Sequence, residues 1–481
     1  MRRHLRRRWL RWLVGLTLFA VLGAGAVVAV VLVWNDRATG DVRGSAADEF
    51  VVTDEPGLVA EPVPAPAEPA PAAPSTTAPA PAEPAPVELP AEPVETETAP
   101  PTGTGAAEPP PAPPAPAEVD PGLTWPIWGL DAGRTRVVPD AVALRPPFRQ
   151  VWAYRAGSLI EFPPVIEEHR LYMGTNLGRV VSLDGETGKV LWQKETKRCM
   201  AASPAIADGV LYVALMDPSP CKDPDLSAPG YVLALDAATG KEKWRFEAGV
   251  VESSPLVVDG TVYVGSWDRN VWAIDAATGK PRWSYPTGDR VKGSVSFRNG
   301  VVYVGSYDGR LYALDARTGK LRWRASGRSG ILSGSRFYST PALAYGRVFV
   351  GDLNGSVYAY GAQTGDLIWS RSTDRYVYSS PAVWNRTVFV GSYDGTLYAF
   401  DAATGDTRWE FDAGGPISGS PVVMAGLVYV STFDERTYAV NAETGKRVWE
   451  FKDGQYSPIV TDGERVYLAG HVRLFALEPG R

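Results

Sequence analysis

The sequence predicts an all-β fold, an eight-bladed β-propeller built from four-stranded antiparallel blades. Three observations support this prediction. A segment of about 40 residues with the pattern of four short strands recurs along most of the 481-residue chain. A tryptophan recurs at the same place in the copies, and a Thr-Gly turn precedes every one of these tryptophans but the first. The first and last copies are incomplete, and each contains what the other lacks.

The repeating unit is clearest in residues 299–323, NGVVYVGSYDGRLYALDARTGKLRW. Two apolar runs are joined by a two-residue hairpin turn at Gly309, where glycine accepts a positive φ without steric cost. A second tight turn ends at Gly319 and leads to an outer strand that carries Trp323. An earlier strand near residues 294–297 completes four antiparallel strands. Because such a sheet is apolar on both faces, it needs neighbouring copies to cover it.

The copies can be counted from their outer-strand tryptophans, which are 39 to 52 residues apart. They are Trp152, Trp192, Trp244, Trp283, Trp323, Trp369, Trp409 and Trp449. The first has no earlier strands of its own, whereas residues 457–477 have three strands and no tryptophan. Pairing these two parts closes a ring of eight blades and removes the exposed sheet edges. We interpret the tryptophans as structural wedges between blades.

The charge of the chain argues against nucleic acid as a partner. The formal net charge is −6, and the predicted propeller has no basic patch. The only three histidines, His4, His169 and His471, are scattered along the chain and indicate no metal site. We expect the propeller to be a monomer.

The N-terminal region has the pattern of a membrane anchor. Residues 1–12 form a basic tail with six arginines, and residues 13–34 are predicted to form a transmembrane helix. The uncharged run 13–33 spans about 31 Å as a helix, close to the roughly 30 Å hydrocarbon core. The arginines place the N-terminus in the cytoplasm and the propeller outside. The alternative is a cleaved signal peptide, exported by the general or the twin-arginine route.

Residues 35–122 are rich in Pro, Ala and Glu and are predicted to be disordered, since they cannot bury enough apolar area to fold. A Pro-rich chain stays extended, so this linker either carries the propeller far from the membrane or acts as a spacer of no required length. Residues 123–147 are irregular and are expected to pack as a lead-in loop on the propeller, which occupies 148–481.

The two cysteines, Cys199 and Cys221, lie in loops on the same face of the second blade. In an oxidising compartment outside the cell they are expected to form a disulfide. Closing this loop stabilises the fold by roughly 3 kcal/mol in the chain-entropy model.

One ring of positions varies between blades and is the candidate binding site. It lies two residues before the start of each first strand, which is marked in most blades by Ser-Pro or Thr-Pro. The residues there are Glu161, Ala201, Glu252, Lys292, Tyr338, Tyr378, Ser418 and Gln455. We expect them to line the mouth of the central channel, where the charged and polar ones either orient a small polar ligand or face water.

The pattern VYVGSYDG-LYALDA-TGK--W resembles the repeat of the quinoprotein-like propellers, which include the pyrroloquinoline quinone alcohol dehydrogenases and BamB, the β-barrel assembly scaffold of outer membranes. The resemblance covers about residues 148–477 and implies the eight-bladed fold. The dehydrogenases use adjacent cysteines, a Glu, Asn and Asp set for Ca²⁺, and a catalytic Asp. This chain has no Cys-Cys pair, and we can place no counterpart of that set.

These observations lead to a hypothesis about function. We expect a membrane-anchored, extracytoplasmic scaffold without catalysis and without a cofactor, which binds an envelope protein or a cell-wall component. One alternative is a dehydrogenase that uses pyrroloquinoline quinone with calcium. A second alternative is a sensor or carbohydrate-binding module that uses the channel mouth.

Overall fold

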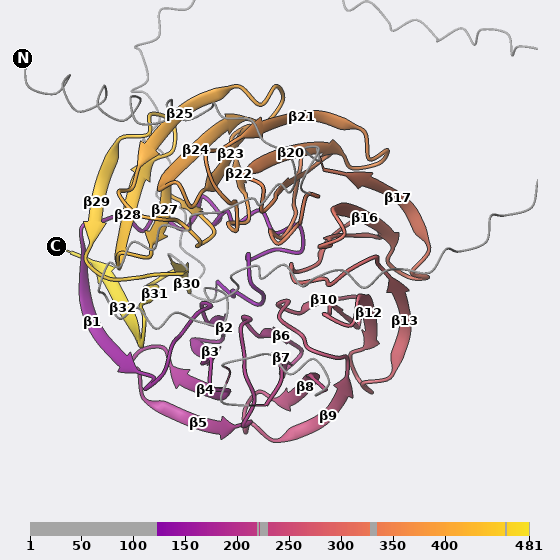
Figure 1. The fold of residues 1–481 in the computed structure, drawn as a ribbon. Helices are drawn as coiled ribbons and strands as arrows, with labels where there is room; N and C mark the ends of the chain where they lie inside the picture. The colour runs from indigo at the N-terminus through magenta and orange to yellow at the C-terminus, as the bar shows by residue number, and fades with distance from the viewer. Residues whose placement is uncertain (1–122, 219–220, 222–228, 328–333, 457–458, 481) are drawn as a thin grey trace, which may run out of the picture. The chain divides into compact units, whose positions relative to one another are not determined.

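The computed structural model describes residues 123–218, 221, 229–327, 334–456 and 459–480. This part of the chain forms eight four-stranded antiparallel sheets arranged as blades around a ring (Figure 1). The predicted eight-bladed propeller is therefore confirmed. The predicted basic tail, transmembrane helix and linker lie outside the described residues. Within the described part, no helix is long and apolar enough to span a bilayer.

The first four blades follow one another along the chain. Blade 1 contains β2 (Val165–Glu167), β3 (Arg170–Gly174), β4 (Arg179–Asp184) and β5 (Val190–Glu195). Blade 2 contains β6 (Ala205–Ala207), β7 (Val210–Leu215), β8 (Tyr231–Asp236) and β9 (Glu242–Glu247). Blade 3 contains β10 (Leu256–Val258), β11 (Thr261–Gly265), β12 (Asn270–Asp275) and β13 (Pro281–Pro286). Blade 4 contains β14 (Ser296–Arg298), β15 (Val301–Gly305), β16 (Arg310–Asp315) and β17 (Leu321–Ser326).

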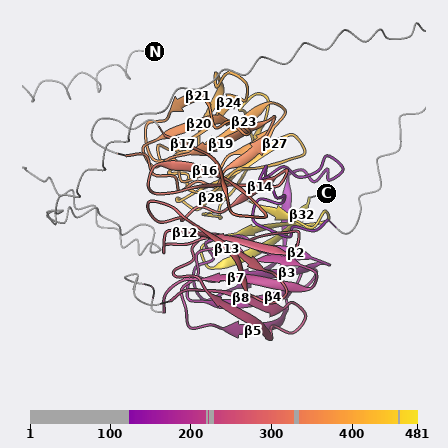
Figure 2. The ribbon, with the colours of Figure 1, turned by 90° about the vertical axis from the view of Figure 1, so that its right-hand side faces the viewer.

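The next three blades repeat this order, and Figure 2 shows the stacked blades from the side. Blade 5 contains β18 (Ala342–Ala344), β19 (Arg347–Gly351), β20 (Ser356–Gly361) and β21 (Leu367–Ser372). Blade 6 contains β22 (Ala382–Trp384), β23 (Thr387–Gly391), β24 (Thr396–Asp401) and β25 (Thr407–Asp412). Blade 7 contains β26 (Val422–Met424), β27 (Leu427–Thr432), β28 (Arg436–Asn441) and β29 (Arg447–Phe451).

Blade 8 joins the two ends of the folded part. It contains β30 (Val460–Thr461), β31 (Val466–Ala469) and β32 (Arg473–Pro479), and its outer strand is β1 (Phe148–Arg155). Strand β1 pairs antiparallel with β32, from Phe148 opposite Pro479 to Arg155 opposite Arg473. Figure 1 shows the indigo β1 beside the yellow β32. This closure is the one that the incomplete first and last repeats predicted.

Neighbouring blades contact each other through the outer-strand tryptophans. The indole nitrogen of Trp283 donates a hydrogen bond of 2.9 Å to the carbonyl oxygen of Ala316 in the next blade. The same ring lies against Gly319, where an added Cβ would come within 2.7 Å of it. Gly319 also has a φ of +71°, so glycine is needed there for two reasons. The same indole bond occurs at Trp152, Trp192, Trp244, Trp323, Trp369 and Trp409.

A second ring of contacts lies near the axis. Before the first strands of blades 3 to 7, the Ser or Thr hydroxyl oxygen accepts a hydrogen bond from the backbone N–H of its counterpart in the preceding blade. For example, Ser254 N–H donates to Ser294 Oγ, and Ser380 N–H donates to Ser420 Oγ, each at 2.9 Å. Similar bonds join Ser203 to Ser254, Ser294 to Thr340, and Thr340 to Ser380. These hydroxyl groups explain why this position repeats in the sequence.

The lead-in segment lies inside the ring, and we call residues 125–138 the axial plug. Its backbone bonds to the inner strands of successive blades. Trp125 pairs with Ile166 of β2, and Ile127 pairs with Ala205 of β6. Further along, backbone N–H groups of β14, β18, β22 and β26 donate hydrogen bonds to plug carbonyl oxygens, which belong in this order to Ala132, Gly133, Thr135 and Arg136. The axial plug therefore covers inner edges that would otherwise carry unpaired backbone groups.

The turns before the outer strands are held by aspartates. Asp315 accepts hydrogen bonds from the guanidinium of Arg322 at 2.7 Å and from the Thr318 hydroxyl at 2.8 Å. Both bonds lower the pKa of Asp315, which falls to about 2, and the bond from Arg322 has the larger effect. Asp275 and Asp401 occupy the same turn position, and their pKa values are likewise lowered to about 2.

We predict that replacing Trp283 with Ala lowers the free energy of unfolding by roughly 3–5 kcal/mol, because the inter-blade wedge and its hydrogen bond are both lost. Urea unfolding measures this. Trp283→Phe keeps most of the ring but removes the donor, and should cost only about 1 kcal/mol. Equal losses in the two variants would contradict the wedge interpretation.

We predict that acid weakens the fold through the turn aspartates. Because their folded pKa is depressed, they stabilise the fold above about pH 4, and this contribution is lost as pH falls toward 2. Thermal unfolding from pH 5 to pH 2 should show a smaller fall in midpoint for the triple variant D275N/D315N/D401N than for the wild type. An identical fall in both proteins would exclude this role.

Candidate binding site at the channel mouth

A cavity of about 50 Å³ lies at the mouth of the central channel. Six of the eight predicted ring residues line it: Glu161, Glu252, Lys292, Tyr338, Tyr378 and Ser418. Ala201 and Gln455 do not line the cavity, although Tyr456, the neighbour of Gln455, does. The side chains at this repeat position therefore meet at the mouth of the channel.

The charged side of the cavity is organised around Glu252. One carboxylate oxygen accepts a hydrogen bond of 2.6 Å from the Tyr338 hydroxyl, and the other accepts one of 3.0 Å from the Trp267 indole. The ammonium of Lys292 lies 3.4 Å from the second oxygen. The side chains of Lys292 and Glu252 are only 11% and 7% exposed. This is an almost buried ion pair with additional hydrogen bonds to the carboxylate.

Lys292 is also held by aromatic faces. Its ammonium nitrogen lies 4.0 Å from the centroid of the Trp267 ring and 5.3 Å from that of Tyr307. At these distances a cation is attracted by the negative face of each ring. The two rings therefore fix the position of the charge as well as shielding it from water.

The other side of the cavity is formed by an aromatic arc, defined as Tyr338, Tyr378, Tyr393, Phe433 and Tyr456. Successive ring centroids along this arc are 5.0, 4.8, 5.5 and 5.1 Å apart. Such spacings are those of tilted and edge-to-face aromatic contacts. The cavity therefore presents a continuous aromatic wall opposite a charged one.

Sequence reasoning missed several residues of the mouth. Trp267, Tyr307, Tyr393 and Phe433 share one repeat position, directly after a Ser or Thr in the turn between second and third strands. That recurrence is a signal that would have found them. Trp128 of the axial plug also lines the cavity, and its irregular segment carries no such signal.

Two of the tyrosines at the mouth stay protonated. Burial, assisted by the negative charge of Glu252, raises the pKa of Tyr338 and of Tyr307 well above the usual value. The Tyr338 hydroxyl therefore remains a donor to Glu252 throughout the neutral pH range.

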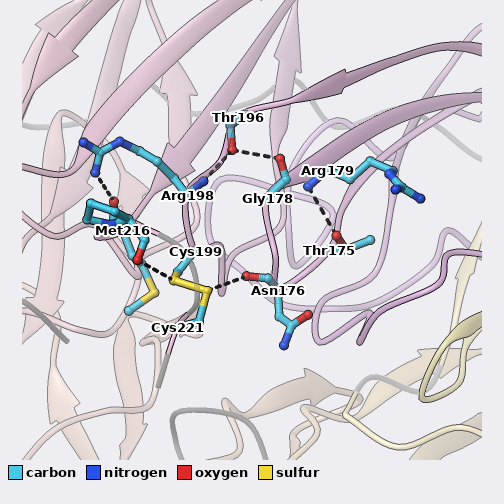
Figure 3. The surroundings of a disulfide bond; sticks show 10 residues. Thr175, Asn176, Gly178, Arg179, Thr196, Arg198, Cys199, Met216 and Cys221 are labelled. Atoms are coloured by element: carbon cyan, nitrogen blue, oxygen red, sulfur yellow. Dashed lines mark hydrogen bonds between the residues drawn. A yellow bond between two sulfur atoms is a disulfide. The ribbon is translucent and has the colours of Figure 1, made fainter. Parts of the chain in front are cut away.

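The two cysteines form the expected bond close to this site. Cys199 and Cys221 are joined in a disulfide with a Cα–Cα distance of 5.5 Å (Figure 3). The bond belongs to a small apolar cluster with Val250 and Trp267. Because Trp267 in turn holds Glu252, the disulfide supports the charged side of the cavity from behind.

With this geometry established, we compared the chain with known proteins. The family model described as outer membrane protein assembly factor BamB matches residues 128–220, 228–380 and 353–480. Among solved structures, the chain is similar to BamB from Moraxella catarrhalis, with a TM-score of 0.56 and 20% identity over 69% of this chain and 98% of that one.

The chain is also similar to quinone enzymes. The quinohemoprotein alcohol dehydrogenase from Comamonas testosteroni has a TM-score of 0.62 and 17% identity over 75% of this chain and 81% of that one. A curated relative, the dehydrogenase subunit of the quinone alcohol dehydrogenase of Komagataeibacter europaeus, is 32% identical over 88 residues. That match covers 16% of this chain and only 11% of the relative's length. The structural likenesses, at these identities, show the fold alone.

These findings correct two expectations from the sequence. We expected no enzyme and no cofactor, and both expectations are contradicted, because the curated relatives and some of the similar structures are quinone-dependent or quinohemoprotein alcohol dehydrogenases. The expectation rested on the missing Cys-Cys pair and on the missing counterpart of the Glu, Asn and Asp set, and neither absence separates this chain from relatives that share its repeat.

The residues at the mouth do not fit pyrroloquinoline quinone with calcium. Glu161 and Glu252 are the carboxylates that line the cavity, and Glu252 is already bonded to Lys292, Trp267 and Tyr338. Across the described residues, no three His, Cys, Asp or Glu side chains are grouped so as to hold a metal ion. We therefore derive no reaction step through this cofactor.

We predict that Lys292→Met lowers the free energy of unfolding by about 3 kcal/mol, because it leaves the Glu252 carboxylate buried without its cation. The double variant Glu252→Gln/Lys292→Met should recover most of this loss. Urea unfolding of the single and double variants measures the coupling. Arg149→Met, which breaks the exposed pair with Glu478, is the control and should cost less than about 1 kcal/mol. Additive losses at residues 252 and 292 would refute the coupling.

Proposed function

The chain belongs to the family described as outer membrane protein assembly factor BamB, and from this premise we propose that it is a recognition module of the cell envelope. Its channel mouth binds a partner protein. One observation supports this proposal above all: the aromatic arc and the Glu252–Lys292 pair face each other across the same cavity. Protein interfaces concentrate their binding energy in such desolvated, aromatic-lined pockets.

The charges favour a cationic group of the partner. Glu161, Glu252 and Lys292 are the charged residues that line the cavity, and together they carry one net negative charge. The faces of Tyr378 and Tyr393 add further attraction for a cation. We therefore propose that the partner inserts an arginine or lysine side chain, whose stem packs along the aromatic arc.

The proposal also covers where in the cell envelope the propeller lies. We propose that residues 13–34 anchor the chain in the cell membrane with the propeller outside, and that residues 35–122 give it reach. The uncharged run 13–33 and the Pro-rich composition of the linker support this arrangement. An extended tether lets the propeller meet partners away from the membrane surface.

A second candidate is quinone-dependent oxidation of an alcohol, which the names of the curated relatives favour. Calorimetry of the full chain with pyrroloquinoline quinone and Ca²⁺, combined with a dye-reduction assay on alcohols, decides it. Dye reduction that requires both the quinone and an alcohol would establish this candidate.

We predict that chemical cross-linking in intact cells joins the wild-type chain to a specific envelope protein. The double variant Tyr378→Ala/Tyr393→Ala removes two rings of the aromatic arc, and its yield of that cross-linked species should fall at least about tenfold. Tyr345→Ala is the matched control, since Tyr345 is exposed and does not line the cavity. Mass spectrometry identifies and quantifies the species.

Two outcomes would overturn the proposal. One is the same captured protein at equal yield from the wild type and the double variant. The other is binding on a glycan array that Tyr378→Ala/Tyr393→Ala abolishes while protein capture is unchanged, which would assign the mouth to carbohydrate. A Glu252→Ala variant that still captures the protein but releases it more quickly would support docking at the cavity.

A further inference from the structure

A second, smaller cavity lies along the axial plug. Its volume is about 10 Å³, close to the minimum that holds one water-sized particle. Trp125 and Arg136 of the plug line it, together with Trp128, Gly129, Pro163, Ser420, Val422, Ile459 and Val460. It therefore lies between the plug and the inner parts of blades 1, 7 and 8.

Two hydrogen-bond donors on residues that line this cavity have no partner among the described residues. They are the indole nitrogen of Trp125 and the Nη2 nitrogen of Arg136. Both side chains are only 1% exposed. The Nη1 nitrogen of Arg136 is satisfied, since it donates to the carbonyl oxygens of Arg134 and Pro381 at 2.7 and 3.1 Å. A buried donor without an acceptor costs about 1–3 kcal/mol, and more when it is charged.

The surroundings also carry an excess of positive charge. Arg134 and Arg136 are both fully buried, and the nearby carboxylate that acts on both is Asp131. Burial lowers the pKa of each guanidinium to about 9, which still leaves both charged at neutral pH. Two buried cations with one carboxylate are an incompletely compensated group.

We propose that this cavity binds a monatomic anion, chloride under physiological conditions, which accepts hydrogen bonds from Trp125 Nε1 and Arg136 Nη2. The ligand chemistry follows from the donors, because an indole N–H and a guanidinium donate and never accept. A cation is excluded by the charge of Arg136. The volume restricts the ligand to about the size of one water molecule, so carboxylate, phosphate and sulfate do not fit.

The anion has a structural consequence. Trp125 pairs with β2 in blade 1, whereas the backbone of Arg136 bonds to β26 in blade 7. An anion between these side chains links the two ends of the axial plug across the interrupted blade 8. The inference is independent of the proposed partner at the mouth.

The test uses the full chain in detergent at pH 7 and constant ionic strength. We expect the calorimetric unfolding midpoint of the propeller to rise saturably, by about 2 °C or more, as bromide or chloride replaces gluconate. Trp125→Phe keeps the ring packing but removes the N–H donor, and should abolish the difference between halide and gluconate. Trp384→Phe, which changes a tryptophan outside this cavity, should retain it.

Anomalous diffraction from crystals grown in bromide provides a second measurement that needs no variant. We expect a bromide peak between Trp125 Nε1 and Arg136 Nη2. Equal midpoints for the wild type in halide and gluconate would overturn the proposal. So would density at this position without an anomalous signal, which would assign the cavity to a water molecule.

Discussion

The fold depends on one contact that recurs around the ring, that of an outer-strand tryptophan with the glycine turn of the following blade. The indole of Trp283 both bonds to the Ala316 carbonyl and occupies the space above Gly319 that a Cβ would fill. This contact explains why a tryptophan and a Thr-Gly turn share one period in the sequence. Blades 1 to 6 each supply the ring to one neighbour and the turn to the other, so these blades are not complete alone.

Much of this could be predicted because it is local and periodic. The blade count, the closure of β1 on β32 and six cavity residues all follow from repeat positions. The axial plug could not be predicted, because residues 125–138 occur once and their contacts reach strands up to 287 positions away, as between Arg136 and Val423. Non-repeating segments of this kind depend on the assembled ring and leave no periodic trace.

The expectation about function was confirmed only in part, because the propeller family is shown whereas the expected absence of an enzyme and of a cofactor is contradicted. The repeat determines the fold, and similar folds occur in both the assembly factor and the dehydrogenases. In this chain, the loops at the mouth carry the features that the repeat does not determine, because Glu252 bonds to three neighbours there and the aromatic arc forms the opposite wall. A carboxylate that is satisfied by a lysine, an indole and a phenol is held rigidly, and it fixes the shape of this wall of the cavity.

The mouth and the axial plug are joined through Trp128. Its ring lies 5.9 Å from that of Phe162, beside it in the mouth cavity, and 4.2 Å from the Arg136 guanidinium in the plug. Its carbonyl oxygen accepts a hydrogen bond from Arg134. The buried charges of the plug therefore fix the orientation of a side chain that lines the cavity. Binding to a preformed surface avoids the entropy of ordering it, so this rigidity favours the binding that we propose for the mouth.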